Sequence, residues 1–157
     1  MKPTDEEIST WHRYFGSRAN NRAWQLSESD QRTAQESEEM VHAAHAALFH
    51  WQAVGNANHR AHAEQLLAHV YALCANGAEA RKYFDSAQAV FSGPDAQPWE
   101  VAIHCAIAAH VAAACGQSAE HHAQYQRAEA LIAALPSEED RNILYATLAV
   151  IPKPRVA

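Results

Sequence analysis

The stretch from Ala61 to Phe91 constrains the fold of this chain more than any other part of the sequence. Its first half is apolar at the spacing of one face of an α-helix, at Ala63, Leu66, Leu67, Val70, Tyr71 and Cys74. Its second half repeats that spacing at Ala80, Phe84, Ala87 and Phe91. Gly77 lies between the halves and can adopt the left-handed conformation that ends many helices. The stretch therefore predicts two packed helices joined by a tight turn.

The rest of the chain predicts more helices of the same kind. Periodic apolar positions, separated by polar turns, predict seven helices near residues 5–27, 32–54, 57–76, 78–92, 97–115, 117–134 and 137–150. No segment alternates apolar and polar residues, so no strand is expected. We therefore expect one all-α domain over the 157 residues, with a core that includes Leu67, Tyr71, Phe84, Ile107 and Tyr125. The four tryptophans, Trp11, Trp24, Trp51 and Trp99, are also expected in the core.

The composition argues against several classes of function. Twelve Lys and Arg against eighteen Asp and Glu give a net charge of −6, without the basic patch typical of nucleic-acid binding. No apolar run approaches the roughly 18 residues of a membrane span. The start is polar and acidic, unlike a secretory signal, and three cysteines without CxxC spacing are typical of free thiols. The sequence predicts a cytoplasmic protein that binds neither nucleic acid nor membranes.

The central helix pair carries part of a known repeat pattern. Leu67-Ala68 and Tyr71 stand at first-helix positions of that pattern, and Ala80, Phe84 and Ala87 stand at second-helix positions. The next pair fits more weakly, through Ala108-Ala109, Ala112, Tyr125 and Ala128. The central pair resembles a tetratricopeptide repeat. The segments 19–24, 40–46 and 137–141 make the whole chain similar to small uncharacterised bacterial tetratricopeptide-like proteins.

The resemblance implies a right-handed superhelix of antiparallel helix pairs. The pairs would span about 5–54, 57–92 and 97–134, followed by a capping helix at 137–150. In such repeats the first helix of each pair lines a concave groove. The register then predicts that this groove is lined by His62, Gln65, His69 and His110, and that it binds an acidic or carboxylate-ended peptide. In the alternative interpretation these side chains face solvent or a partner helix.

Histidine is unusually frequent, with eleven residues in the chain. The tightest group is Glu38, His42 and His45, which one helix would carry within two turns. A carboxylate and imidazoles at this spacing can hold a divalent metal if another helix supplies further ligands. In the alternative interpretation, they are helix histidines hydrogen-bonded to their neighbours.

Two classes of function follow from these observations. The first is a non-catalytic helical scaffold that needs no cofactor and binds a protein or peptide. A second copy of the chain, in a homodimer, is one candidate partner. The alternative is a histidine-rich helical protein, enzymes included, that binds a divalent metal or a small molecule. The sequence contains no nucleophile elbow, phosphate loop or metalloprotease motif, so it names no reaction and no catalytic residue.

Overall fold

The computed structural model describes residues 2–155, and every regular element in that range is a helix. The helices are α1 (Asp5–Ser27), α2 (Ala34–Val54), α3 (Ala57–Leu73), α4 (Gly77–Phe91), α5 (Pro98–Ala114), α6 (Ser118–Ala133) and α7 (Glu138–Ala149). The expected all-α fold with about seven helices is therefore confirmed. None of the described helices combines the length and the apolar character that crossing a bilayer requires.

The turn between α3 and α4 differs from the prediction. Ala75, rather than Gly77, has the positive φ of 56°. The side chain of Asn76 then accepts a hydrogen bond from the backbone N–H of Glu79 and caps α4. Gly77 is the first residue of α4, where an added Cβ would lie 2.6 Å from the carbonyl oxygen of Ala114. Glycine is needed here because α4 approaches the end of α5 closely, not because α3 ends there.

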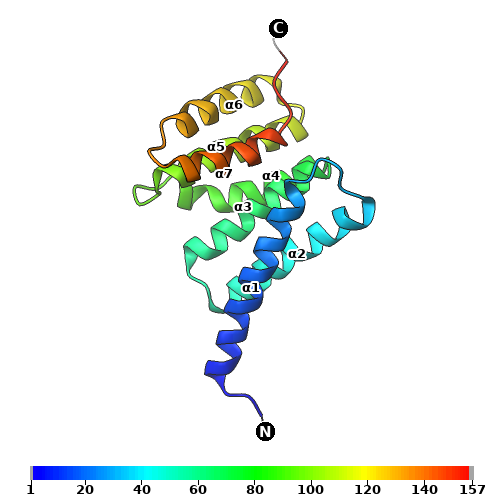
Figure 1. Ribbon diagram of the computed structural model, residues 1–157, viewed down its shortest axis with the longest axis vertical. Helices are drawn as coiled ribbons and strands as arrows, with labels where there is room; N and C mark the ends of the chain where they lie inside the picture. The colour runs from blue at the N-terminus through cyan, green and yellow to red at the C-terminus, as the bar shows by residue number, and fades with distance from the viewer. Residues whose placement is uncertain (1, 156–157) are drawn as a thin grey trace.

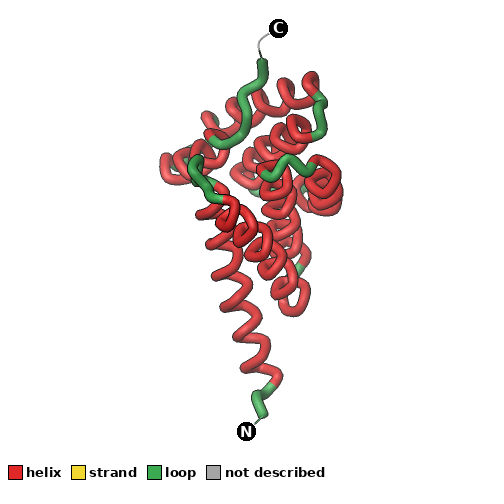
Figure 2. Tube along the Cα trace, turned by 90° about the vertical axis from the view of Figure 1, so that its right-hand side faces the viewer, coloured by secondary structure: helices red, strands yellow, loops and turns green. Residues whose placement is uncertain are grey.

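Consecutive helices form pairs, and the pairs stack along the chain (Figure 1). Helix α1 packs on α2, α3 on α4, and α5 on α6. Helix α3 also contacts both helices of the first pair, α5 contacts both helices of the second, and α7 contacts both helices of the third. The odd-numbered helices therefore form one continuous row, α1–α3–α5–α7. Figure 2 shows the same stack after a quarter turn, with the N-terminal half of α1 extending beyond the other helices.

Helices α3 and α5 supply much of the core. Leu67, Phe84, Ile107 and Tyr125 are buried, as predicted. Tyr71 is only partly buried, because its hydroxyl lies at the edge of the core and contacts His45. Helix α5 is buried on nearly every side, and its many alanines allow α3, α4, α6 and α7 to pack against it. This packing makes α5 the central helix of the fold.

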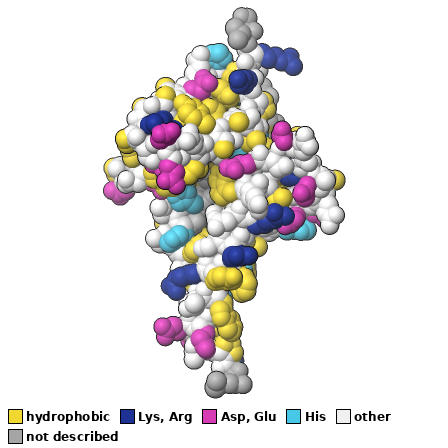
Figure 3. All heavy atoms as spheres, viewed as in Figure 1, with side chains coloured by type: hydrophobic (Ala, Val, Ile, Leu, Met, Phe, Trp, Pro, Cys, Tyr) yellow, Lys and Arg dark blue, Asp and Glu magenta, His cyan; other side chains and the backbone are white. Residues whose placement is uncertain are grey.

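The prediction that all four tryptophans belong to the core is wrong for two of them. Trp11 is 51% exposed and Trp99 is 38% exposed, whereas Trp24 and Trp51 are partly buried. Trp11 lies on the N-terminal half of α1, which extends past α3, and Figure 3 shows hydrophobic side chains along this part of the surface. The apolar spacing in this half of α1 therefore marks an exposed stripe and not a core face.

Candidate functional site

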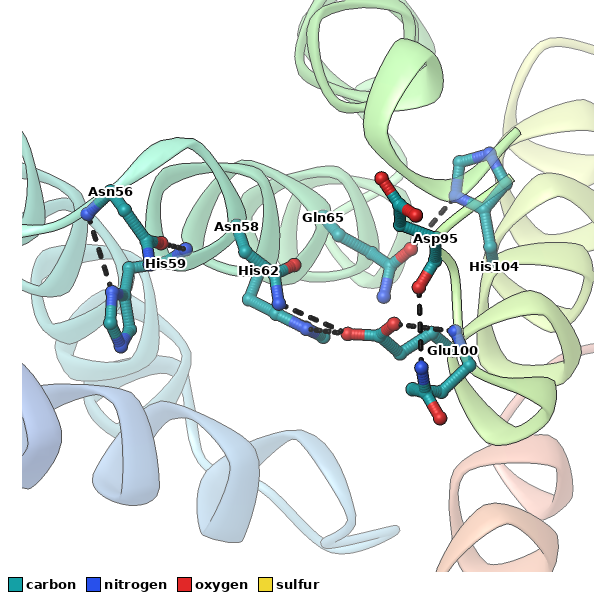
Figure 4. A network of polar contacts seen from close by, with 9 residues as sticks. Asn56, Asn58, His59, His62, Gln65, Asp95, Glu100 and His104 are labelled. Atoms are coloured by element: carbon teal, nitrogen blue, oxygen red, sulfur yellow. Dashed lines mark hydrogen bonds and ion pairs between the residues drawn. The ribbon is translucent and has the colours of Figure 1, made fainter. Parts of the chain in front are cut away.

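Seven polar side chains meet where α3 packs against α5, and we call this set the polar ladder. The members on α3 follow the i, i+4, i+7, i+11 spacing of a single helix face, so they all face the same neighbour. They are Asn58, His62, Gln65 and His69 on α3, with Glu100, His104 and His110 on α5. Contacts across the interface divide the ladder into three groups, of which Figure 4 shows the first two.

Glu100 is the acceptor of the first group and is only 5% exposed. Its Oε1 accepts hydrogen bonds from His62 Nε2 at 2.8 Å and from Asn58 Nδ2 at 3.3 Å. Its Oε2 accepts one from the backbone N–H of Gln97 at 2.8 Å. Burial raises the pKa of Glu100, but the hydrogen bonds outweigh burial and leave the pKa below its usual value. The buried carboxylate is therefore ionised and fixes the His62 proton on Nε2.

Gln65 and His104 form the second group. His104 Nδ1 lies 2.8 Å from Gln65 Oε1, so the Nδ1–H of His104 is the donor. The His104 ring stacks on Phe84, with ring centroids 4.5 Å apart and ring planes 9° apart. Burial, helped by the positive charge of Arg127, lowers the pKa of His104 to about 4. His104 is thus a neutral ring in the core at pH 7.

His69 and His110 form the third group, and their Nδ1 atoms lie 2.9 Å apart. The two rings meet edge to face, and His69 also stacks on Trp24 with centroids 5.5 Å apart. Burial, then the neighbouring charges of His110 and Arg32, lower the pKa of His69 well below its usual value. Burial, then His121, lower the pKa of His110 to about 4. Both rings are therefore neutral at pH 7, and one donates to the other.

The unpaired nitrogen of His69 decides which ring donates. His69 Nε2 is fully buried and has no hydrogen-bond partner among the described residues. A buried N–H without an acceptor costs more than a buried lone pair without a donor. We therefore place the His69 proton on Nδ1, where it is donated to His110 Nδ1. His110 then carries its own proton on Nε2.

Three of the four side chains predicted to line an open groove are buried in the polar ladder. Gln65, His69 and His110 are 1%, 0% and 3% exposed. Of the four, only the His62 side chain, which is 29% exposed, is accessible to solvent and to a ligand. The four residues do lie along one face, as the register required, but α5 covers that face of α3. The expectation of a solvent-facing lining is therefore corrected for these three, and the alternative, that they face a partner helix, describes the structure.

A pocket of about 450 Å³ lies between the four odd-numbered helices, and we call it the inner pocket. His62 and Gln65 connect it to the polar ladder, since both also line the pocket. The other lining side chains include large apolar groups and two carboxyl groups: Trp24, Glu28, Trp99, Ile103, Asp140 and Ile143. No Lys or Arg belongs to the lining within residues 2–155. The inner pocket is therefore apolar with a negative charge balance.

Two side chains of the inner pocket have notable surroundings. Trp99 stacks on His62, with ring centroids 5.4 Å apart and planes 12° apart, and the hydrogen bond to Glu100 fixes His62 in turn. Partial burial raises the pKa of the Glu28 carboxyl. The polar ladder thus holds the Trp99 indole in place, so that part of the pocket is formed before any ligand arrives.

Glu38, His42 and His45 do not form a metal centre in this structure. Glu38 and His42 are exposed, and His45 Nε2 lies 2.7 Å from the hydroxyl of Tyr71. Across the described residues, no three His, Cys, Asp or Glu side chains lie close enough to hold a metal ion together. The alternative interpretation of hydrogen-bonded helix histidines describes His45.

The sequence reasoning missed Glu100 and the two carboxyl groups of the inner pocket. Glu100 could have been found, because it precedes His104 by one turn on a helix that is otherwise apolar. Glu28 lies just beyond the end of α1 and Asp140 lies in the first turn of α7, so only the packing of α1 and α7 brings them together. Comparisons with protein-family models, curated proteins and solved structures found no match for this chain.

Proposed function

We propose that this protein is a non-catalytic scaffold of the tetratricopeptide-like kind, which binds a peptide segment of a partner protein in the inner pocket. The stacking supports this proposal, because each odd-numbered helix after the first packs on both helices of the preceding pair. Such an arrangement places the first helices of successive pairs side by side, and a superhelix of antiparallel pairs has the same order. The row α1–α3–α5–α7 is then the binding face.

The observation that carries the proposal is the composition of the inner pocket. Trp24 on α1, Trp99 on α5 and Ile143 on α7 give it an apolar surface on three different helices. Exposed apolar side chains that converge in a concave site are typical of ligand-binding pockets in proteins. A side chain such as Ile143, which is 54% exposed on α7, adds nothing to the core and is available to a ligand.

The charge of the inner pocket indicates which peptides it binds. Glu28 and Asp140 line the pocket without a lining cation among the described residues, so the local field favours a positive group. The face of an indole ring such as Trp99 also attracts a cation. We therefore propose a segment with an apolar side chain next to Lys or Arg as the ligand, in place of the acidic or carboxylate-ended peptide expected from the sequence.

Peptide selection tests this proposal directly. Random peptides displayed on phage are selected on the immobilised protein, and the enriched peptides are then titrated by fluorescence anisotropy. We expect enrichment of aliphatic or aromatic residues next to Lys or Arg. Ile143→Ser should weaken binding of these peptides about tenfold or more, because it removes a large apolar side chain from the lining of the pocket.

Tyr145→Ser is the matched control, since Tyr145 is 42% exposed on the same helix but does not line the inner pocket. The control should bind like the unchanged protein. Glu28→Gln with Asp140→Asn should weaken binding and reduce its dependence on salt. Enrichment of acidic peptides, or equal binding by Ile143→Ser and Tyr145→Ser, would contradict the proposal.

A further inference from the structure

A second pocket, of about 460 Å³, lies at the end of the polar ladder that is far from Glu100. It forms between the C-terminal ends of α3 and α5, the start of α6 and the segment 152–155. We call it the basic pocket, after the charged side chains that line it. The inner pocket and the basic pocket share no lining residue.

The basic pocket has the opposite charge to the rest of the protein. Lys153, Arg155 and His121 line it, and no Asp or Glu does so within the described part of the chain. The chain as a whole has a net charge of −6, so a pocket without a carboxylate is unusual here. His121 is held in place because its Nε2 lies 2.7 Å from the carbonyl oxygen of Pro152. This contact also fixes the segment that carries Lys153 beside α6.

The start of α6 adds hydrogen-bond donors to the same pocket. Gln117 and Ser118 line the pocket, and Gln117 precedes α6 without capping it through its side chain. Gly116, with φ of 71°, turns the chain into the helix and also lines the pocket. The first N–H groups of a helix have no partner within the helix, and they carry partial positive charge. Ser118, the first residue of α6, lines the basic pocket, so an anion there can accept a hydrogen bond from this end of the helix.

The buried ring of His110 provides an independent indication of a ligand. His110 is 3% exposed, yet it lines the basic pocket. Its Nδ1 is occupied by His69, and the proton arrangement derived above places an N–H on Nε2. This Nε2 makes no hydrogen bond to any described residue, so its N–H is free to donate to a ligand in the basic pocket. His110 Nε2 is not among the fully buried polar atoms without a partner, so a ligand in the pocket can reach it.

We propose that the basic pocket is a binding site for a phosphate-type anion, with contacts from Lys153, Arg155, the first N–H groups of α6 and His110 Nε2. Arg and Lys both bind phosphate oxygens, and a phosphate can accept several hydrogen bonds at once. The phosphate group can belong to free inorganic phosphate or to a phosphorylated residue of a partner.

The site can be tested by NMR titration of the full chain with inorganic phosphate, against chloride at the same ionic strength. We expect saturable shifts of the backbone amides from Gly116 to Glu120 and of the His110 ring. In the protein without phosphate, His110 should already carry its proton on Nε2 and have no proton on Nδ1. The variant Lys153→Ala with Arg155→Ala should bind phosphate about tenfold more weakly or worse, since it removes two charged contacts.

The matched control is Lys2→Ala with Arg60→Ala, which changes the net charge equally at exposed positions outside the pocket. The control should bind phosphate like the unchanged protein. Phosphoserine and acetate are added in separate titrations. Tighter binding of phosphoserine indicates a phosphorylated partner, and tighter binding of phosphate indicates the free ion. Shifts that do not saturate, equal weakening in both double variants, or a preference for acetate would each overturn the proposal.

Discussion

Two histidine pairs in this protein have nearly the same geometry and different surroundings. His69 and His110 meet with their Nδ1 atoms 2.9 Å apart and ring centroids 4.8 Å apart. His12 and His50 meet with the same nitrogen distance, 2.9 Å, and centroids 5.0 Å apart. The first pair is buried between α3 and α5, whereas the second joins α1 to the end of α2 and is partly exposed.

Burial, more than the contact between the rings, lowers the pKa values of His69, His110 and His50 in these two pairs. Burial lowers the pKa of His69 well below its usual value, and it lowers the pKa of His110 to about 4. The pKa of His50 is also lowered, by partial burial and then by His12, but water still reaches the ring. We therefore expect that protonating or truncating the buried pair lowers the free energy of unfolding substantially. The same changes in the outer pair should lower it much less.

Truncation should separate the two pairs most strongly. His69→Ala removes a fully buried ring from between Trp24 and His110 and leaves His110 Nδ1 without its donor. We expect a loss of about 2–5 kcal/mol in the free energy of unfolding. His12→Ala, in the partly exposed pair, should cost less than about 1 kcal/mol. Urea unfolding of both variants measures the two losses, and equal losses would mean that the two pairs are equally buried.

Acid should destabilise the protein through the buried histidines. The pKa of His104 and of His110 is about 4 in the folded protein and about 6.5 in the unfolded chain. The unfolded chain therefore binds more protons between these values, and stability falls as the pH falls from about 6.5 toward 4. We expect a loss on the order of 3 kcal/mol between pH 7 and pH 5 in urea unfolding. Constant stability over this range would show that these rings are not buried in their neutral form.

The hydrogen-bonded carboxylate of Glu100, at the other end of the ladder, should give a smaller effect. Glu100→Gln removes the buried charge and leaves one acceptor oxygen for the three donors of His62, Asn58 and Gln97. We expect a loss of about 1–3 kcal/mol at pH 7, measured by thermal and urea unfolding. Glu129→Gln, at an exposed position, is the control and should stay within about 0.5 kcal/mol of the unchanged protein.

The smallest effect is expected at a partly buried contact. Tyr71→Phe removes the hydroxyl that lies 2.7 Å from His45 Nε2, and water can replace part of this hydrogen bond. We expect a loss of about 0.5–1 kcal/mol. Tyr14→Phe removes an exposed hydroxyl and should change the free energy of unfolding by less than Tyr71→Phe. If Tyr71→Phe lowered the free energy of unfolding as much as His69→Ala does, the loss in stability would not follow burial.

Local patterns in the sequence were enough to predict the helices. The capping boxes of Thr4 with Glu7 and of Thr33 with Glu36 depend on neighbouring residues, and so do the apolar spacings. The core positions Leu67 and Ile107 follow from the same spacings. These features need no knowledge of which helix lies beside which.

The polar ladder could not be placed in the same way. A histidine on the polar side of α3 faces either solvent or another helix, and only tertiary packing decides between them. One signal was available, because α5 is apolar nearly all round and such a helix is buried on all sides. That rule would have placed His104 and His110 inside. Trp11 is an error of the opposite kind. Its helical spacing predicted a buried side chain, but no helix of the described chain covers it.

The most direct test of the buried ladder is the protonation state of its individual rings. Long-range ¹H–¹⁵N NMR spectra of the histidine side chains, recorded from pH 7 to pH 5, report which ring nitrogens carry protons. We predict that His69, His104 and His110 remain neutral at pH 5.5, with the proton on Nδ1 in His69 and on Nε2 in His110. Conversion of these three rings to imidazolium above pH 6, in the folded protein, would contradict the account.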